Sequence, residues 1–302
     1  EIHLGQNAQE RYDAPYLVAA RRDLQSLLLD ALKAYDCIEL HCSKKFITYT
    51  QNAHHITAEM TDGSNYEGCL LIGADGVWSR VRHMFASDQI PRQTGLMAWR
   101  AMISAKDAPS IFTSPDVNAW LGPYSHMVHY RVSGGDMVNL VAVTKGRALA
   151  KTWSDDTPKE TLFEELRPFA PALRKAVMDV SDWTAWPLMV LNPFKNWSKG
   201  RAVLLGDAAH AIVPFLAQGA AMAIEDASTL ANLIAEHRDD HNKAFELFKQ
   251  KRFRRCQRVL SKSIYQSHIY HASGRLAKIR NGGLKMIPSS LLLRQYDWLY
   301  KE

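Results

Sequence analysis

The 302-residue chain has few cysteines and lacks any long apolar run. Its four cysteines form no Cys-x-x-Cys pair and show no zinc-like spacing, which predicts reduced, mostly buried thiols in a cytoplasmic protein. No apolar stretch approaches the ~18 residues of a membrane-spanning helix, and the chain opens without a signal-peptide pattern. These absences argue against a secreted disulfide-rich domain, a structural zinc module and a membrane protein.

Strong charge of one sign is also missing. Basic residues number 37 and acidic residues 31, so the net charge is +6 and is spread along the chain. The densest basic run, 249–258, lies in a helical pattern beside Phe248, which is typical of a solvated helix face. Nucleic-acid binding is therefore a weak alternative, because no recognised motif accompanies the charge. A modest positive charge also suits anionic nucleotides and acidic aromatic substrates.

Segment 201–237 is the most particular stretch of the chain. Its apolar start predicts a buried strand, Gly206-Asp207 ends that strand, and a long helical pattern begins at Ala220. A helix start offers free backbone N–H groups and a partial positive charge, which suit an anion or an electron-rich ring edge. Asp207 can accept hydrogen bonds from ligand hydroxyls, and Gly219 allows close backbone approach because it lacks a Cβ. For Gly-Asp alone, a plain strand-to-helix connection is the alternative.

The sequence GDAAHAIVPFLAQGAAMAIEDA, which begins at Gly206, resembles the Gly-Asp motif of class A flavoprotein aromatic hydroxylases, the salicylate hydroxylase-like FAD-dependent monooxygenases. The resemblance implies that Asp207 holds the ribityl chain of FAD. It also implies that Pro214 and the backbone of Gln218 and Gly219 border the isoalloxazine ring. The family has a histidine at the position of His210, with a mainly structural role.

A second motif lies upstream in the order that the family has. GADGVWSRVR, which begins at Gly73, is similar to the family's Asp-Gly motif, and Ser79 can cap the short helix that follows. The resemblance implies that Asp75 lies near the FAD pyrophosphate and contributes to NAD(P)H use. The family also has an arginine at the start of an early helix that reaches the flavin. Arg21 or Arg22 matches it, and Arg21 fits better.

Periodicity predicts the elements between these motifs. An amphipathic helix is expected within 16–35, and short strands at 38–42, 46–51, 54–60 and 66–72. From Pro91 to Asn192 strand-like runs dominate, with two helical stretches, which predicts an inserted mixed, mainly antiparallel sheet with helices on one side.

The predicted fold is α/β: a Rossmann-like FAD/NAD(P)-binding domain with this inserted substrate domain. The domain boundaries are 1–90 for the first part of the FAD-binding domain, 91–192 for the substrate domain, and 193–302 for the second part with the C-terminal helices. The family begins with a strand, a GxGxxG loop and a helix that cradle the ADP part of FAD. No GxGxxG occurs here, so the domain is incomplete at its N-terminus. We expect weak FAD binding by this chain alone, or a second polypeptide that supplies the unit.

His126 and Tyr130 are the candidate catalytic residues. On a strand their spacing puts both side chains on one face, while His129 points the other way. In the family a similar His-x-x-x-Tyr pair lines the substrate pocket, which implies that the two residues bind or deprotonate the substrate phenol. Two half-buried polar residues on a sheet face are the alternative. Arg100 could bind a substrate carboxylate, but a structural ion pair is favoured.

The resemblance implies an FAD-dependent monooxygenase that hydroxylates a hydroxybenzoate-, salicylate- or hydroxypyridine-like substrate. NAD(P)H would reduce FAD, and one atom of dioxygen would reach an activated phenol ring. The expected partners are a small aromatic acid or phenol and dioxygen, without nucleic acid, metal or membrane, in a cytoplasmic monomer or homodimer. The alternatives are a quinone-pathway flavin hydroxylase, a halogenase, whose Trp-x-Trp-x-x-Ile signature is absent, and a non-catalytic remnant that binds a ligand or partner.

Overall fold

The computed structural model describes residues 5–146 and 158–301 of the chain. The chain forms two compact units. Unit 1 comprises residues 1–38, 95–187 and 268–302, and unit 2 comprises residues 39–94 and 188–267. The middle segment of unit 1, 95–187, lies within the predicted substrate domain, 91–192. In the described ranges no helix is both long and apolar enough to cross a membrane.

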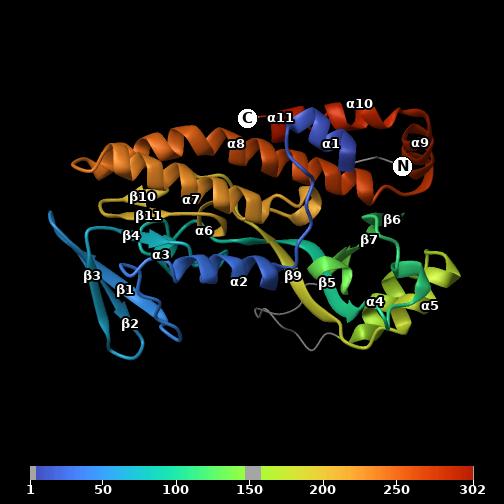
Figure 1. Ribbon diagram of the computed structural model, residues 1–302, viewed down its shortest axis with the longest axis horizontal. Helices are drawn as coiled ribbons and strands as arrows, with labels where there is room; N and C mark the ends of the chain where they lie inside the picture. The colour runs from blue at the N-terminus through green and yellow to red at the C-terminus, as the bar shows by residue number, and fades with distance from the viewer. Residues whose placement is uncertain (1–4, 147–157, 302) are drawn as a thin grey trace. The chain divides into compact units, whose positions relative to one another are not determined.

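Unit 1 is built on a five-stranded sheet of order β6-β7-β8-β5-β9 (Figure 1). Its strands are β5 (Arg92–Ser104), β6 (Asn118–Gly122), β7 (Ser125–Val132), β8 (Met137–Lys145) and β9 (Thr184–Val190). Strands β5 to β8 pair antiparallel, and the short helix η2 (Ser133–Gly135) joins β7 to β8. The expected mainly antiparallel sheet is therefore present.

Helices cover one face of this sheet. Side chains of α4 (Lys159–Glu165), α5 (Pro171–Met178) and η1 (Ser110–Phe112) form a core with alternate residues of the strands, among them Trp99, Met127 and Leu140. Because side chains alternate along a strand, the residues between these project from the opposite face. The remaining helices of unit 1 are α1 (Gly5–Tyr12), α2 (Arg21–Leu32), α9 (Gly274–Met286), α10 (Ser289–Arg294) and α11 (Asp297–Tyr300).

Unit 2 contains two small sheets. One is antiparallel, with β1 (Phe46–Gln51), β2 (Ile56–Met60) and β3 (Asn65–Gly68); the other has the order β10-β11-β4. In the second sheet β4 (Leu71–Gly73) runs parallel to β11 (Ala202–Leu204), and β10 (Ser198–Lys199) pairs antiparallel with β11. The helices are α3 (Arg80–His83), α6 (Asp207–His210), η3 (Pro214–Leu216), α7 (Gly219–Glu236) and α8 (His241–Tyr270), whose residues from His268 onward belong to unit 1. Helices α7 and α8 lie side by side (Figure 1).

Three local predictions were wrong. Residues 38–42 form no strand, and Ile38 and Leu40 are exposed. The predicted strand 66–72 is two strands, β3 and β4, in different sheets, because Leu71 pairs with Ala202 far along the chain. The cysteines are free, as expected, but only Cys256 of the four is buried.

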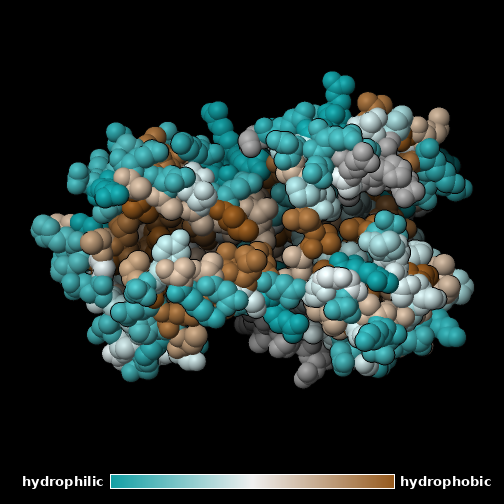
Figure 2. Space-filling model, in the orientation of Figure 1, coloured by the Kyte–Doolittle hydropathy of each residue, from teal (hydrophilic) through white to brown (hydrophobic). Residues whose placement is uncertain are grey.

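Helix α2 forms as predicted, but none of its residues is buried. Leu27 is 65% exposed and Leu28 is 51% exposed. Figure 2 shows hydrophobic residues among the hydrophilic ones on the surface that it draws. The amphipathic pattern therefore identified the helix correctly without identifying a buried face.

Candidate functional site

The two predicted aspartate turns lie at the same edge of one sheet in unit 2. Strands β4 and β11 are parallel neighbours, with Gly73 opposite Leu204. Asp75 follows β4 by two residues, and Asp207 follows β11 by three. Both turns therefore stand at the carboxyl ends of adjacent parallel strands, where open α/β sheets bind their ligands. The structure brings together two predicted cofactor-binding residues that are far apart in the sequence.

Asp75 is exposed and organises the start of α3. Its Oδ2 accepts hydrogen bonds from the backbone N–H groups of Arg80 at 2.8 Å and Val81 at 3.2 Å. The buried guanidinium of Arg82 then donates to the carbonyl of Ala208 at 2.8 Å, which ties α3 to the turn after β11. Burial lowers the pKa of Arg82. Ser79 caps α3 through the backbone N–H of Arg82, at 2.9 Å, as predicted.

The Gly206-Asp207 turn needs glycine at its first position. Gly206 has φ of +60°, in the region that favours glycine, and a Cβ built on it would lie 3.2 Å from the Cβ of Ala223 on α7. Asp207 begins the short helix α6 and is exposed. The tight turn thus presents a carboxylate at the surface of unit 2.

The segment from Pro214 to Gly219 leads into the apolar helix α7. Pro214 is exposed, whereas Gln218 is buried and donates from Nε2 to the carbonyl of Leu216 at 3.2 Å. Gly219 begins the 18-residue helix α7. A Cβ built at Gly219 would meet no described heavy atom within 4 Å, so a ligand can approach the backbone there. Together with Asp207, these residues fit the polyhydroxyl chain and ring edge of the expected FAD.

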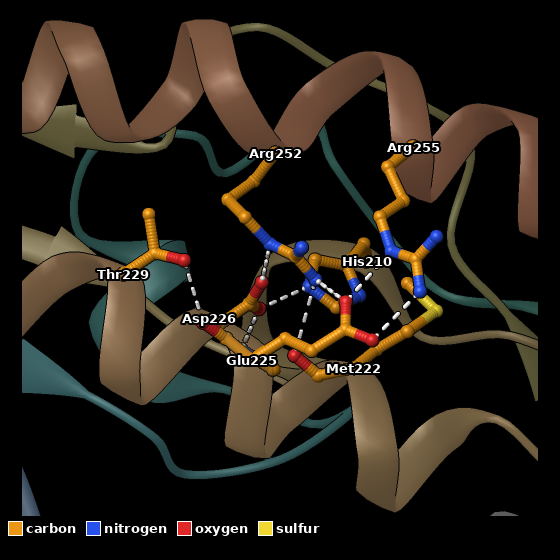
Figure 3. A network of polar contacts seen from close by, with 8 residues as sticks. His210, Met222, Glu225, Asp226, Thr229, Arg252 and Arg255 are labelled. Carbon is orange, nitrogen blue, oxygen red and sulfur yellow. Dashed lines mark hydrogen bonds and ion pairs between the residues drawn. The ribbon is translucent and has the colours of Figure 1, made fainter. Parts of the chain in front are cut away.

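A network of buried charged residues supports the Gly206-Asp207 turn (Figure 3). Asp226 on α7 is fully buried. Its Oδ2 accepts from the backbone N–H of Gly206 at 3.1 Å and lies 2.5 Å from Nε2 of His210, and its Oδ1 accepts from Nε of Arg252 at 2.6 Å. One carboxylate therefore joins the strand-end turn, α6 and α8.

The network pairs groups of opposite charge. Burial opposes ionisation of His210, but contacts with Asp226 and Cys256 outweigh it and raise the pKa of His210 to about 10. Burial likewise opposes ionisation of Asp226, but His210 and Arg252 outweigh it and lower the pKa of that carboxyl. Glu225 pairs with Arg252 and Arg255, each at 2.7 Å. His210 is therefore a structural residue, as the sequence resemblance implied; the role of Asp226 was missed.

In unit 1 the predicted catalytic pair lies on the face of the sheet opposite the helix-covered core. His126 is buried and Tyr130 is half-buried, both on β7. His129 points the other way, as predicted. Its ring lies between those of Phe112, with centroids 5.1 Å apart, and Trp120, 6.1 Å away.

Other phenol side chains gather near Tyr130. Burial raises the pKa of Tyr16, and the charges of Tyr130 and Tyr270 raise it further. Burial, followed by the charges of Tyr270 and Tyr16, raises the pKa of Tyr296 to about 12. These four tyrosines come from four separate parts of unit 1. Three of them could not be predicted from the sequence, because an isolated tyrosine carries no spacing signal.

Arg100 lies beside this group. Its guanidinium stands over the ring of Trp186, 5.5 Å from the centroid, and its buried Nε has no hydrogen-bond partner among the described residues. Burial and then the charge of Arg21 lower the pKa of Arg100, while Tyr130 acts to raise it. Arg21 and Tyr130 therefore each lie close enough to Arg100 for their charges to act on it. The favoured structural ion pair was wrong: in the part of the chain that is described, no carboxylate pairs with Arg100.

The start of α2 distinguishes Arg21 from Arg22. Arg22 is exposed and lies 4.0 Å from the carboxylate of Asp23. Asp23 in turn accepts from the hydroxyl of Ser133 at 2.6 Å, which fastens α2 to the turn between β7 and β8. Arg21 is exposed as well, but its charge acts on that of Arg100 on β5, so it stays the better candidate of the two.

Comparison with known sequences finds a family model described as an FAD binding domain, which matches residues 3–263. 3-Hydroxybenzoate 6-hydroxylase 1 of Aquipseudomonas alcaligenes is 33% identical over 300 residues, which span 99% of this chain and 76% of that protein. 6-Hydroxynicotinate 3-monooxygenase of Bordetella bronchiseptica is 34% identical over 264 residues, which span 85% of this chain and 67% of that protein.

Solved structures share the fold. Klebsiella pneumoniae HpxO complexed with FAD and uric acid superposes with a TM-score of 0.82 at 23% identity, covering 95% of this chain and 73% of that one. A substrate complex of salicylate hydroxylase superposes with a TM-score of 0.72 at 23% identity, covering 92% and 72%. The predicted fold class is therefore confirmed.

Proposed function

Because this chain belongs to the FAD-dependent aromatic hydroxylases, we propose that its substrate is an aromatic ring with one hydroxyl and one carboxylate, and that 3-hydroxybenzoate is the leading candidate. The enzyme is a monooxygenase that uses FAD, with NAD(P)H and dioxygen as co-substrates. Relatives named for 3-hydroxybenzoate, 3-amino-4-hydroxybenzoate and 6-hydroxynicotinate all act on rings that carry both groups. A cytoplasmic location and a monomeric or homodimeric state stay predictions from the sequence.

The observation that carries this proposal is the placement of Arg100. Arg100 is half-buried, and its buried Nε has no hydrogen-bond partner among the described residues; a donor left unsatisfied in this way is costly, and a ligand carboxylate offsets that cost. Guanidinium groups bind carboxylates through two parallel hydrogen bonds. Because Tyr130 lies near Arg100 on the same face of the sheet, the face offers a cation for the carboxylate and a phenol for the hydroxyl. An aromatic acid with a ring hydroxyl matches both.

We assign the substrate hydroxyl to His126 and Tyr130. Burial, together with His271, lowers the pKa of His126 to about 3, so its imidazole is neutral at pH 7 and offers a nitrogen lone pair to the substrate hydroxyl. The substrate O–H bond breaks and an N–H bond forms on His126, while the Tyr130 hydroxyl hydrogen-bonds the resulting oxygen anion. A phenolate ring is more electron-rich than a phenol and reacts faster with an electrophile. When bound, FAD accepts reducing equivalents from NAD(P)H and supplies the electrophilic oxygen.

The cofactor assignments follow from the turn geometry in unit 2 and from the start of α2. Asp207 accepts hydrogen bonds from ligand hydroxyls, and the N-terminus of α7 supports the electron-rich edge of the ring. The residues assigned to FAD or NAD(P)H binding are Arg21, Asp75, Asp207, Pro214, Gln218 and Gly219.

A substrate panel tests the proposal. With FAD and NADH or NADPH present, oxidation of the reduced nucleotide is measured with 3-hydroxybenzoate, its neutral amide, benzoate and 6-hydroxynicotinate. The two hydroxylated acids should stimulate oxidation and the other two should not. Arg100→Gln should raise the KM for the acid about 10- to 100-fold, because it removes a charged hydrogen bond. Equal response to acid and amide would contradict the proposal, and a preference for 6-hydroxynicotinate would replace the leading candidate.

A further inference from the structure

His126 has an imidazole partner that comes from the far end of unit 1. Its Nδ1 lies 2.9 Å from Nε2 of His271, a residue 145 positions later. The two rings stand 5.1 Å apart at 44°. Tyr270 packs edge-on against the His126 ring, with centroids 5.0 Å apart. A direct contact between two imidazoles means that one ring nitrogen donates and the other accepts.

The backbone holds His271 in place. Its carbonyl accepts from the N–H of Tyr124, just before β7, at 3.1 Å. The guanidinium of Arg280 on α9 donates to the carbonyls of Ile269 and Tyr270, at 3.2 Å and 2.8 Å. The chain reversal between α8 and α9 is therefore fixed to the strand that carries His126. An imidazole that is fixed in this way can select the tautomer of its partner.

Both rings are neutral at pH 7. Burial, together with the positive charges of His268 and Arg280, lowers the pKa of His271 to about 4. Since His126 is also neutral, the pair has two tautomeric arrangements. In one, His126 donates from Nδ1 to His271, and its Nε2 is a proton acceptor. In the other, His271 donates from Nε2, and the Nε2 of His126 carries a proton.

We propose that His271 is a positioning residue that holds His126 in its proton-accepting tautomer and takes over the Nδ1 proton of His126 during deprotonation of the substrate. The inference rests on the proposed function. The substrate O–H bond breaks as an N–H bond forms at Nε2 of His126. The Nδ1–H bond of His126 breaks as an N–H bond forms at Nε2 of His271, and His271 releases its Nδ1 proton to solvent. One proton leaves the substrate, one reaches solvent, and no electrons are transferred.

This relay avoids leaving a positive charge on the buried ring of His126. A proton retained on His126 would form an imidazolium in a buried site, which costs free energy. With the relay both rings are neutral before and after the transfer, and only their tautomers change. His271 is half-buried whereas His126 is buried, so His271 is the member of the pair with more contact with solvent.

Three variants of the full chain test the inference. His271→Gln keeps a hydrogen-bonding group beside His126 but cannot pass a proton, His271→Ala leaves space for free imidazole, and His54→Gln is the control, because His54 is an exposed histidine of unit 2. With FAD present, phenolate formation from bound 3-hydroxybenzoate is followed by ultraviolet absorbance, and hydroxylation by product analysis. His271→Gln should slow both at least about 10-fold with KM changed little, imidazole should restore His271→Ala, and His54→Gln should match the unmodified protein.

A second readout does not depend on turnover. Nitrogen NMR of the protein without FAD should show His126 and His271 neutral across pH 5 to 8 (roughly the range of ordinary histidine titration), and His271→Gln should change the tautomer of His126. If the unmodified protein shows this pairing but acts on no hydroxybenzoate, the proposed function fails and the pairing stands. Normal phenolate formation in His271→Gln would overturn the relay. Failure of imidazole to restore a folded His271→Ala protein would overturn it as well.

Discussion

Replacing Asp226 by asparagine should weaken unit 2 more than any other single charge removal at its buried network. Asparagine keeps the size of the side chain and can still accept from the backbone N–H of Gly206. It removes the negative charge that faces His210 at 2.5 Å and Arg252 at 2.6 Å. Because Asp226 is fully buried, water cannot replace that charge.

Two estimates of the free energy of unfolding lost in Asp226→Asn agree. Removing one partner of a buried ion pair costs about 3–5 kcal/mol. The pKa of His210 rises from 6.5 to about 10 in the folded protein, which corresponds to a free energy on the order of 5 kcal/mol. A raised folded-state pKa stabilises the protein fully below pH 6.5, and that contribution is lost as the pH rises through about 10. The difference between the two proteins should therefore be largest near pH 6.5 and shrink toward pH 10.

Urea unfolding followed by tryptophan fluorescence measures this difference, because the ring of Trp197 lies 5.4 Å from that of His210. Glu225→Gln is the matched control: it removes the same charge from the adjacent position, where the side chain is 33% exposed. The control should lose about 1 kcal/mol or less. The reasoning is refuted if both variants lose the same free energy at pH 6.5, or if the loss in Asp226→Asn is unchanged at pH 10.

Three further outcomes are expected. Gly206→Ala should cost about 1–3 kcal/mol in the same unfolding assay, because its positive φ and its approach to Ala223 resist a Cβ; a neutral effect would mean that the turn relaxes freely. Asp207→Ala should weaken FAD binding about 10- to 100-fold in a flavin fluorescence titration, through loss of a charged acceptor, and an unchanged affinity would remove Asp207 from the site. Tyr130→Phe should slow hydroxylation about 100-fold while FAD affinity stays the same; equal turnover would place Tyr130 outside the pocket.

Sequence reasoning succeeded where the signal is local. The turns at Asp75 and Asp207 each end a short apolar strand, and parallel pairing of those strands then brings them to one edge. The opposite directions of His126 and His129 follow from strand alternation alone. Such features need only the few residues around them.

Residues whose deciding partner is remote in the sequence could not be predicted. Asp226 looks like any acidic residue in a helix until the turn at Gly206 folds against it. His271 gains its meaning from a strand 145 positions earlier. Residues 66–72 divide between two sheets because one half pairs with β11. No local pattern carries that information.

The central claim is that this chain binds FAD and transfers one oxygen atom to an aromatic acid that bears a phenol. Incubation with FAD, NAD(P)H, 3-hydroxybenzoate and dioxygen labelled with heavy oxygen, followed by mass spectrometry, tests it most directly. The account predicts a dihydroxybenzoate that carries one labelled oxygen atom, formed in proportion to the nucleotide oxidised. Oxidation of the nucleotide that yields only hydrogen peroxide and unchanged 3-hydroxybenzoate would contradict the account.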